Sequence, residues 1–503
     1  MQRRSSSRAA ALLLLALPLL APIKSLAQAP APATEVLHVT RYADDDGEGS
    51  LRWAISESNR APGRYRIEIA AVGTAPYVIK PTALLPPITG PAQITGAAWG
   101  KTGEFIVLDG TGVVEDKGPQ SCPGAVPGQF GANVRTTTAP ALALVDTAGV
   151  DISGLEIRNF CIGVLIHRSS GNIIHDNRIV ATRGGAGVML TGDDGSGNPT
   201  AAPTVHNKVL RNVFLDNGDG LELTRGAAFN LVAENVFRST AANKEPSQGI
   251  EILFGNDNVV VRNRFEGYSD GVQVNSGNRN FIGANTFTDN TLGLSLSGTG
   301  NVVDGNVLFG NAVAVAVRPS AGGTLARISR NSMFDNGRKI ERCAAGGSCD
   351  PELRRGGIVL GTPGPEHARY IGLRGVGVVA APDQLAKICP DGAPDCQAAP
   401  NKGLEAPSLD AVRLTGVGLN LQGHFDGAPL SRFTVEVFAN RQPAGTEGEL
   451  YLGDVAAATD ANGHAVFSLT VGPPAGAPQS FTATLTSSDG ATSEFSEPVG
   501  LPR

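Results

Sequence analysis

The stretch that decides the fold is residues 258–306, NVVVRNRFEGYSDGVQVNSGNRNFIGANTFTDNTLGLSLSGTGNVVDGN. Asparagines recur in it as pairs five residues apart, and an apolar side chain follows each second asparagine by two residues. A Gly-apolar-x-apolar segment comes later in each unit. The pattern extends outward over about residues 150–335. Its asparagines are Asn172/Asn177, Asn207/Asn212, Asn230/Asn235, Asn258/Asn263, Asn280/Asn285 and Asn301/Asn306, with Asn331 continuing the second series.

The spacing of these units predicts a stack of β coils. Successive members of the second series are 35, 23, 28, 22, 21 and 25 residues apart, so the basic unit has about 22 residues and the longer steps contain insertions. Apolar residues, mainly Val, Ile and Phe, alternate with a period of two, which is typical of strands. Each coil must bury its apolar face against the next, so equivalent side chains should form ladders about 4.8 Å apart. We expect asparagine at the bends to adopt the left-handed backbone region and to bond to the amide of the next coil.

The Asn-x-Phe and Gly-Val-x-Val units resemble the repeats of right-handed parallel β-helix proteins, the pectate-lyase-like fold. The resemblance covers about 210 residues. It implies an all-β solenoid whose right hand agrees with the general rule for parallel crossovers. That group contains polysaccharide lyases, glycoside hydrolases and epimerases, and also adhesins and periplasmic proteins without known chemistry. A repeat of this kind therefore specifies the fold and leaves the function open.

The N-terminal sequence predicts export. Residues 1–27 have a charged start, an apolar run at 9–21 and a small-x-small cleavage site at 25–27, which is typical of a secretory signal. An uncleaved anchor is the alternative, but the apolar run is short for a bilayer span. We expect a monomer without a membrane span after cleavage, located in the periplasm, outside the cell or at the cell surface.

Net charge argues against a nucleic-acid partner. Loss of the signal removes Arg3, Arg4, Arg8 and Lys24, which lowers the formal net charge from −6 to −10. Nucleic-acid binding proteins normally carry basic patches that neutralise phosphates. An anionic polymer would likewise need a local basic strip.

The remaining segments are predicted to form a linker, two caps and a second domain. Residues 28–35 form the linker, and 36–400 the β-helix with its caps, including a capping helix whose N-cap is Ser50. The acidic run Asp44–Asp46 before this helix could bind Ca²⁺ or form a solvated turn. Residues 401–503 show short alternating runs, and the phrases at 447–453, 459–463 and 492–496 resemble immunoglobulin-like β-sandwich modules of bacterial secreted proteins.

Six cysteines in an exported chain predict disulfides. Cys343 and Cys349, and likewise Cys389 and Cys396, each close a short Gly-rich loop. Cys122 and Cys161 remain, and their bond would join the long loop at 111–140 to the first regular coil. A zinc site is a poor alternative because the local pairs lack its usual spacing and histidines.

Polar side chains gather at the outward positions of the central repeats. In Gly-apolar-x-apolar, x should face solvent. The residues at x are Leu165, Met189, Glu222, Glu251, Gln273, Ser295 and Ala316. Asp219, Gln248 and Asp270 precede the glycines, and the next outward positions hold His167, Thr191, Thr224 and Asn275. Insertions at 191–206 and 239–248 could wall a groove beside them.

This polar ladder leaves three interpretations open: a solvated sheet face, sugar binding, or catalysis on a polysaccharide. For catalysis, Glu222, Glu251, Asp219 and Asp270 are the candidate acids and bases, because carboxylates one coil apart repel and so raise one pKa. The candidate substrate-binding residues are His167, Thr224, Arg225, Gln273 and Asn275. In a lyase-like mechanism the acids could instead hold Ca²⁺ while Arg225 or His167 removes a proton.

Catalytic signatures of the resembling families are missing. The Asn-Thr-Asp, Gly-His-Gly and Arg-Ile-Lys segments of polygalacturonase-like hydrolases do not occur, nor does the Asp-Pro-His motif of alginate epimerases. We therefore expect an exported β-helix that binds a polysaccharide, with processing by lyase or glycoside hydrolase chemistry left open. The alternative is a non-catalytic cell-surface or structural, adhesin-like protein. The sequence selects neither the glycan nor the reaction.

Overall fold

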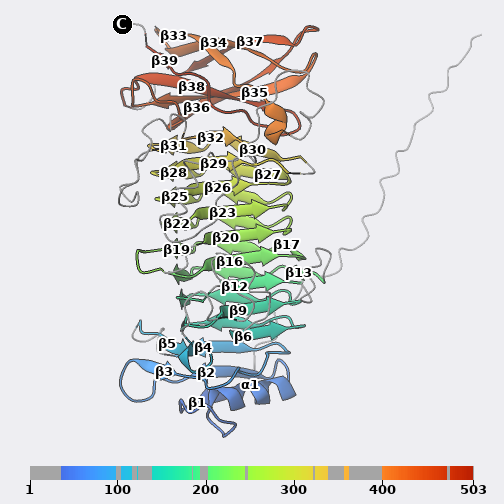
Figure 1. The fold of residues 1–503 in the computed structure, drawn as a ribbon, viewed down its shortest axis with the longest axis vertical. Helices are drawn as coiled ribbons and strands as arrows, with labels where there is room; N and C mark the ends of the chain where they lie inside the picture. Colours follow the sequence, from blue (N-terminus) through green and yellow to red (C-terminus); the bar gives the residue numbers. More distant parts are fainter. Residues whose placement is uncertain are drawn as a thin grey trace, which may run out of the picture.

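The computed structural model describes residues 35–97, 103–115, 122, 139–183, 185–192, 202–243, 247–320, 323–337, 356–361, 399–472 and 476–501. The predicted signal and Cys343, Cys349, Cys389 and Cys396 lie outside these ranges. Three parallel sheets form one long stack of coils, with α1 (Leu51–Arg60) at its start and antiparallel sheets beyond its last coil (Figure 1). The predicted all-β parallel solenoid is confirmed.

From residue 93 onward each coil contributes one strand to each of the three parallel sheets, whereas the coils before it lack one or two of these strands. The eleven-stranded sheet contains β1 (Glu35–Val39), β2 (Tyr65–Ile69), β4 (Gln93–Gly96), β7 (Asp151–Ser153), β10 (Ile173–His175), β14 (Lys208–Leu210), β18 (Leu231–Ala233), β21 (Val259–Val261), β24 (Phe281–Gly283), β27 (Thr299–Asp304) and β30 (Leu325–Ser329). The ten-stranded sheet contains β3 (Tyr77–Ile79), β5 (Ile106–Asp109), β8 (Leu155–Arg158), β11 (Arg178–Val180), β15 (Val213–Leu215), β19 (Val236–Arg238), β22 (Arg264–Glu266), β25 (Thr286–Thr288), β28 (Val307–Phe309) and β31 (Ser332–Phe334).

The nine-stranded sheet carries the Gly-apolar-x-apolar segments. Its strands are β6 (Pro140–Val145), β9 (Ile162–His167), β12 (Ala186–Thr191), β16 (Asp219–Thr224), β20 (Gln248–Leu253), β23 (Asp270–Asn275), β26 (Leu292–Leu296), β29 (Val313–Val317) and β32 (Ile358–Leu360). A small pair, β13 (Thr204–Val205) with β17 (Ala227–Ala228), lies at one corner. Each strand is hydrogen-bonded to the equivalent strand of the next coil, so side chains at equivalent positions line up in columns along the stack.

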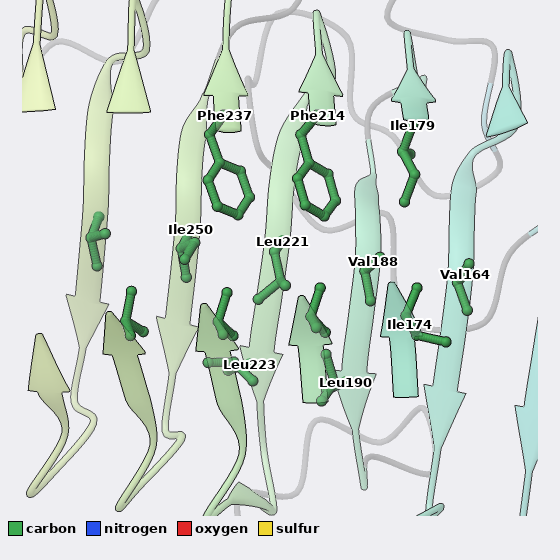
Figure 2. Close-up of a cluster of buried hydrophobic side chains, with 14 of the residues drawn as sticks. Val164, Ile174, Ile179, Val188, Leu190, Phe214, Leu221, Leu223, Phe237 and Ile250 are labelled. Atoms are coloured by element: carbon green, nitrogen blue, oxygen red, sulfur yellow. The ribbon is translucent and has the colours of Figure 1, made fainter. Parts of the chain in front are cut away.

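The core is a set of stacked side chains inside the coils (Figure 2). Phe214, Phe237, Phe265 and Phe287 lie in register, with ring centroids 4.5, 4.9 and 4.7 Å apart. Full burial of one such side chain contributes about 1.5–3 kcal/mol. Glycine is the second residue of β16, β20 and β23, where a phenylalanine of the core lies against the strand: a Cβ at Gly220 would lie 2.5 Å from the Phe237 ring.

Asparagine amides link successive coils, as predicted. Asn235 shows the pattern: its backbone N–H donates to Oδ1 of Asn263 at 2.9 Å, and its Nδ2 donates to the same oxygen at 3.0 Å. The prediction that asparagine itself takes the left-handed conformation is wrong. The residue before it does, as Glu234 (φ 61°) and Arg262 (φ 55°) show. The turn is made one residue earlier, which leaves the asparagine side chain directed along the stack.

The first coil is covered by α1, whose predicted N-cap is confirmed. The Ser50 side chain accepts a hydrogen bond from the N–H of Trp53, and Leu51, Ala54 and Ile55 are buried against the first strands. In the preceding acidic run, Asp44 accepts bonds from Arg52 and from the N–H of Thr82. No helix among the described residues is both long and apolar enough to cross a membrane.

A disulfide joins Cys122 to Cys161, with their Cα atoms 5.7 Å apart. The sulfur pair packs with Val114 at the edge of the coil stack. This bond links the chain segment after β5 to the start of β9.

Two antiparallel, sandwich-like sheets follow the last coil. One contains β33 (Ser408–Thr415), β34 (Gly418–Asp426) and β37 (His464–Val471), and the other β36 (Leu450–Ala458), β35 (Arg432–Asn440), β38 (Ser480–Ser487) and β39 (Val499–Gly500). Asn336 N–H donates to Oε2 of Glu447 at 3.0 Å, and Arg330 N–H donates to Oε2 of Glu436 at 2.8 Å. The antiparallel sheets therefore bond directly to the end of the stack.

Candidate functional site

The outward side chains of the nine-stranded sheet form a column whose polarity changes along the stack. Register pairs Met189 with Glu222, Glu222 with Glu251, Glu251 with Gln273, and Gln273 with Ser295. The predicted alignment of these positions is therefore present. A second column, before each glycine, places Asp219 beside Glu222 and Asp270 beside Gln273. Asp219 faces outward because Gly220 after it faces Phe237 in the core.

The expectation that position x faces solvent is wrong over much of this column. Leu165, Met189, Ser295 and Ala316 are at most 2 % exposed, although they point away from the coil interior. The apolar members pack on their neighbours along the stack: one cluster holds Ile162, Leu165, Ala186 and Met189, and another holds Leu292, Val313 and Ala316. Between these clusters Asp219 and Asp270 are buried, whereas Glu222, Glu251 and Gln273 are half-buried and keep some contact with solvent.

Three carboxyl groups meet on β16 and β20. One oxygen atom from each of Asp219, Glu222 and Glu251 lies within 4.8 Å of the others. Oδ1 of Asp219 accepts a hydrogen bond from the N–H of Gln248 at 2.9 Å. Burial raises the pKa of Asp219, and burial together with the charges of Asp219 and Glu251 raises the pKa of Glu222 well above its usual value. Burial, with the Asp219 charge, also raises the pKa of Glu251 to about 8.

Asp270 lies on the next strand, β23, and its pKa is lower than that of Glu251. Burial raises its pKa to about 6, while the charge of Arg318 and a hydrogen bond from Gln273 act in the opposite direction. The amide Nε2 of Gln273 donates to Oδ2 of Asp270 at 2.7 Å. Asp270 therefore loses its proton at a lower pH than Glu251. Two neighbouring carboxyls whose surroundings separate their pKa values are able to serve as base and acid.

Two arginines face these acids. Arg225 follows β16 directly, and its charge lowers the pKa of Glu222 and Glu251. Arg318 follows β29, and its charge lowers the pKa of Asp270 and Glu251. The net negative charge of the four carboxyls is therefore partly balanced within the site.

The other predicted binding residues are distributed unevenly. Thr224 is buried, and its hydroxyl donates to Oγ1 of Thr191 at 3.0 Å. His167 is 7 % exposed and aligns with Thr191, so one whole coil separates it from β16. Asn275 ends β23 and is half-buried. Gln273 and Arg225 lie with the acids, whereas His167 does not. Of the predicted insertions at 191–206 and 239–248, residues 193–201 and 244–246 lie outside the described residues, so their prediction as groove walls stays untested.

The carboxyl group of three could hold a divalent cation. Asp219, Glu222 and Glu251 offer only oxygen, which suits Ca²⁺, Mg²⁺ or Mn²⁺. Copper prefers imidazole and sulfur ligands. In the portion of the chain that the structure describes, no further group of three His, Cys, Asp or Glu has this geometry.

Arg318 was missed by the sequence analysis. Its signal is the alternation within the repeat: Ala316 occupies the outward position x of β29, and Arg318 is the next outward residue. The same alternation identifies Thr224 two residues after Glu222 and Asn275 two residues after Gln273.

Comparison with known proteins gives three kinds of match. A family model described as periplasmic copper-binding protein (NosD) matches residues 131–326, and confirms the prediction of an exported protein. A protein of Acinetobacter baylyi named 3-dehydroshikimate dehydratase is 51 % identical over 473 residues, covering 93 % of this chain and 96 % of the relative.

Solved structures are similar at lower levels. An alginate lyase from Paenibacillus sp. is 12 % identical with a TM-score of 0.39, covering 61 % of this chain and 97 % of that chain. A periplasmic alginate epimerase is 13 % identical with a TM-score of 0.31, covering 54 % of this chain, which spans 59 % of the epimerase. At these TM-scores neither likeness bears on the reaction.

Proposed function

Because the chain belongs to the family of the Acinetobacter baylyi 3-dehydroshikimate dehydratase, we propose that it removes water from 3-dehydroshikimate or a closely related cyclic hydroxy ketone bearing a carboxylate. The 51 % identity is measured over 93 % of this chain and 96 % of the relative. This similarity supports a shared type of reaction.

The reaction needs one base and one acid. The base removes a proton from the carbon next to the ketone, and the electrons of that C–H bond form a C=C bond. The C–O bond to the neighbouring hydroxyl breaks, and the acid donates the proton with which the hydroxyl leaves as water. Tautomerisation then yields a dihydroxybenzoate. No oxidant or reductant is consumed.

The carboxyls of the site suit these two roles. Asp270, with a pKa of about 6, is ionised at neutral pH and acts as the base. Glu251, with a pKa of about 8, is protonated and acts as the acid for the leaving hydroxyl. Burial and the negative charge of Asp219 favour the protonated form of Glu251, since both disfavour its ionisation.

The observation that carries the proposal is the confinement of the outward carboxyl and amide side chains of the nine-stranded sheet to three strands. Acids and amides occupy β16, β20 and β23, which span about 10 Å across the strands. Leu165 and Met189 precede them, and Leu292 and Val313 follow, all at most 5 % exposed. A single ring matches this extent. A polymer lying along the stack would have to contact the buried apolar columns.

A polysaccharide substrate for a lyase or glycosidase remains the competing prediction. The outward column of Glu222, Glu251 and Gln273 is the feature that favours it, because stacked polar side chains bind sugars in solenoids. The two substrate classes are separated by assaying the purified, processed protein on 3-dehydroshikimate and on a panel of uronate and neutral polysaccharides.

The decisive measurement is the ultraviolet absorbance of dihydroxybenzoate formed from 3-dehydroshikimate. We expect turnover by the wild type and a loss of about 100-fold or more in kcat for Glu251→Gln and for Asp270→Asn, because each change removes a proton-transfer group but keeps its shape. Glu234→Gln, which alters an exposed carboxylate paired with Arg262, is the matched control and should retain full activity. Absence of turnover with 3-dehydroshikimate, together with degradation of a glycan, would refute the proposal.

A further inference from the structure

Three buried polar atoms at this site have no hydrogen-bond partner among the described residues: Oδ1 of Asp270, Oγ of Ser295 and Nε of Arg318. The Asp270 and Ser295 residues are 5 % and 1 % exposed. Buried polar groups in folded proteins nearly always have a partner, so each exception needs an explanation. Atoms of this kind also occur elsewhere among the described residues, but these three lie on one face of one sheet, where a single bound polar molecule would give them partners.

Arg318 reaches this face from a distant coil. Its backbone N–H donates to Leu296 O at 2.7 Å, and its Nη2 donates to Val274 O at 3.4 Å. Since β26 lies between β29 and β23, the side chain crosses β26, the strand that carries Ser295. The guanidinium is thereby held over the edge of the polar section, on the side away from Glu222.

The guanidinium of Arg318 forms no ion pair with a carboxylate of the described residues. Within the described ranges no carboxylate oxygen lies within 4.0 Å of it, although Asp270 and Glu251 are near enough to act on it electrostatically. A guanidinium has five donors, and a single hydrogen bond of 3.4 Å engages one of them. The planar group therefore retains the geometry that binds a carboxylate through two parallel hydrogen bonds.

We propose that Arg318 binds the carboxylate of the substrate, with Ser295 as a second donor. The inference rests on the proposed function for the identity of that substrate. Anchoring the carboxylate at β26 would direct the ring toward β23 and β20, so that its reacting carbons lie at Asp270 and Glu251. Arg318 is thus a specificity-determining residue that selects acids over neutral rings of the same size.

The test compares an acid with its uncharged counterpart. Binding of 3,4-dihydroxybenzoate and of catechol is measured by titration calorimetry on the wild type, Arg318→Gln and Arg318→Lys. We expect Arg318→Gln to weaken binding of the acid by about 10- to 100-fold, which is the usual contribution of hydrogen bonds to a charged group. The affinity for catechol should stay unchanged. Arg318→Lys should recover part of the loss. The control is Arg262→Gln, which changes an exposed arginine and should leave both ligands unaffected.

The possible outcomes separate this inference from the proposed function. Equal weakening of acid and catechol in Arg318→Gln, with unchanged thermal unfolding, would assign the arginine a structural role and overturn the inference. Unchanged affinity for both would overturn it as well, even if the wild type dehydrates 3-dehydroshikimate. Acid-selective loss in a protein without dehydratase activity would support the anion site and refute the reaction. A wild type that binds neither ligand would refute the inference.

Discussion

At the residue scale, the fold depends on buried asparagines whose side chains form hydrogen bonds with the backbone of their own coil and with neighbouring coils. Nδ2 of Asn263 donates to Val232 O, Val261 O and Oδ1 of Asn285 at 3.0 to 3.1 Å. The residue before each asparagine takes a left-handed conformation that costs a non-glycine residue about 1–2 kcal/mol. Two of these residues recover part of the cost by pairing across coils, since Arg262 contacts Glu234 at 2.9 Å.

Replacing one ladder asparagine should therefore destabilise the whole stack. In Asn263→Ala the N–H of Asn235 and the carbonyls of Val232 and Val261 lose buried partners, and we expect a loss of about 3 kcal/mol in unfolding free energy. Thermal unfolding followed by circular dichroism measures it. Asn462→Ala, in an exposed turn, is the control and should change stability by less than about 0.5 kcal/mol. Equal melting temperatures for the two variants would contradict this account.

The acid and base at the site predict a bell-shaped pH dependence of kcat/KM. Asp270 must be ionised, so activity should rise with pH through about 6, and Glu251 must be protonated, so activity should fall through about 8. The residual activity of Glu251→Gln should lack the alkaline limb. Initial rates at fixed ionic strength provide the profile. An alkaline limb that persists unchanged in Glu251→Gln would assign the acid to another group.

At the element scale, both ends of an open parallel stack need cover, because unpaired strand edges promote association. At the N-terminal end α1 supplies it. At the C-terminal end the antiparallel sheets do, and Glu447 takes the place of the next asparagine: its Oε2 accepts from the N–H of Asn336 at 3.0 Å and its Oε1 from the amide Nδ2 at 2.8 Å. Asn401 similarly accepts from the N–H of Ala326 at 2.8 Å.

These contacts predict that the antiparallel sheets stabilise the coils. Glu447→Ala should lower the melting temperature of the β-helix, because the N–H of Asn336 then loses its acceptor and its Nδ2 loses one of three. Glu447→Gln should lower it less, since one carbonyl oxygen remains. Deleting residues 401–503 should cause aggregation that size-exclusion chromatography detects. Arg413→Ala on an exposed strand position is the control. A monomeric truncated protein with an unchanged melting temperature would show that the sheets are an independent module.

At the scale of the whole molecule, the candidate site lies in the middle of the stack (Figure 1). Its strands β16, β20 and β23 are the central three of the nine-stranded sheet. Three coils and more separate them from either end, so fraying of terminal strands does not disturb the spacing of the carboxyls. A parallel stack with fixed 4.8 Å steps is a rigid support for acid–base groups.

The acid–base proposal predicts that divalent cations are dispensable. Dialysis against a chelator should leave the rate of 3-dehydroshikimate dehydration unchanged, because proton transfer between Asp270, Glu251 and substrate requires only side chains. Activity assays before and after dialysis, and after addition of Ca²⁺, Mg²⁺ or Mn²⁺, measure the effect. Loss of activity that one of these ions restores would instead identify Asp219, Glu222 and Glu251 as its ligands.

The features that could be predicted from the sequence are those that follow from its repeat or from adjacent residues. The repeat of asparagines, phenylalanines and glycines predicted the stacked coils and the alignment of Glu222, Glu251 and Gln273, because equivalent positions in a solenoid must lie in register. The N-cap at Ser50 was likewise readable, since capping depends on adjacent residues. The pairing of Cys343 with Cys349 and of Cys389 with Cys396 stays a prediction.

Only the tertiary structure decided how the outer face of the nine-stranded sheet is used. Burial of Met189 and Ser295 and the raised pKa of Glu251 depend on what surrounds a side chain in three dimensions, which alternation along a strand does not reveal. The approach of Arg318 to Val274 joins residues 44 positions apart through a side chain that crosses a strand. Periodicity specifies which residues share a column, whereas desolvation and side-chain reach determine which of them can exchange a proton or hold a charge.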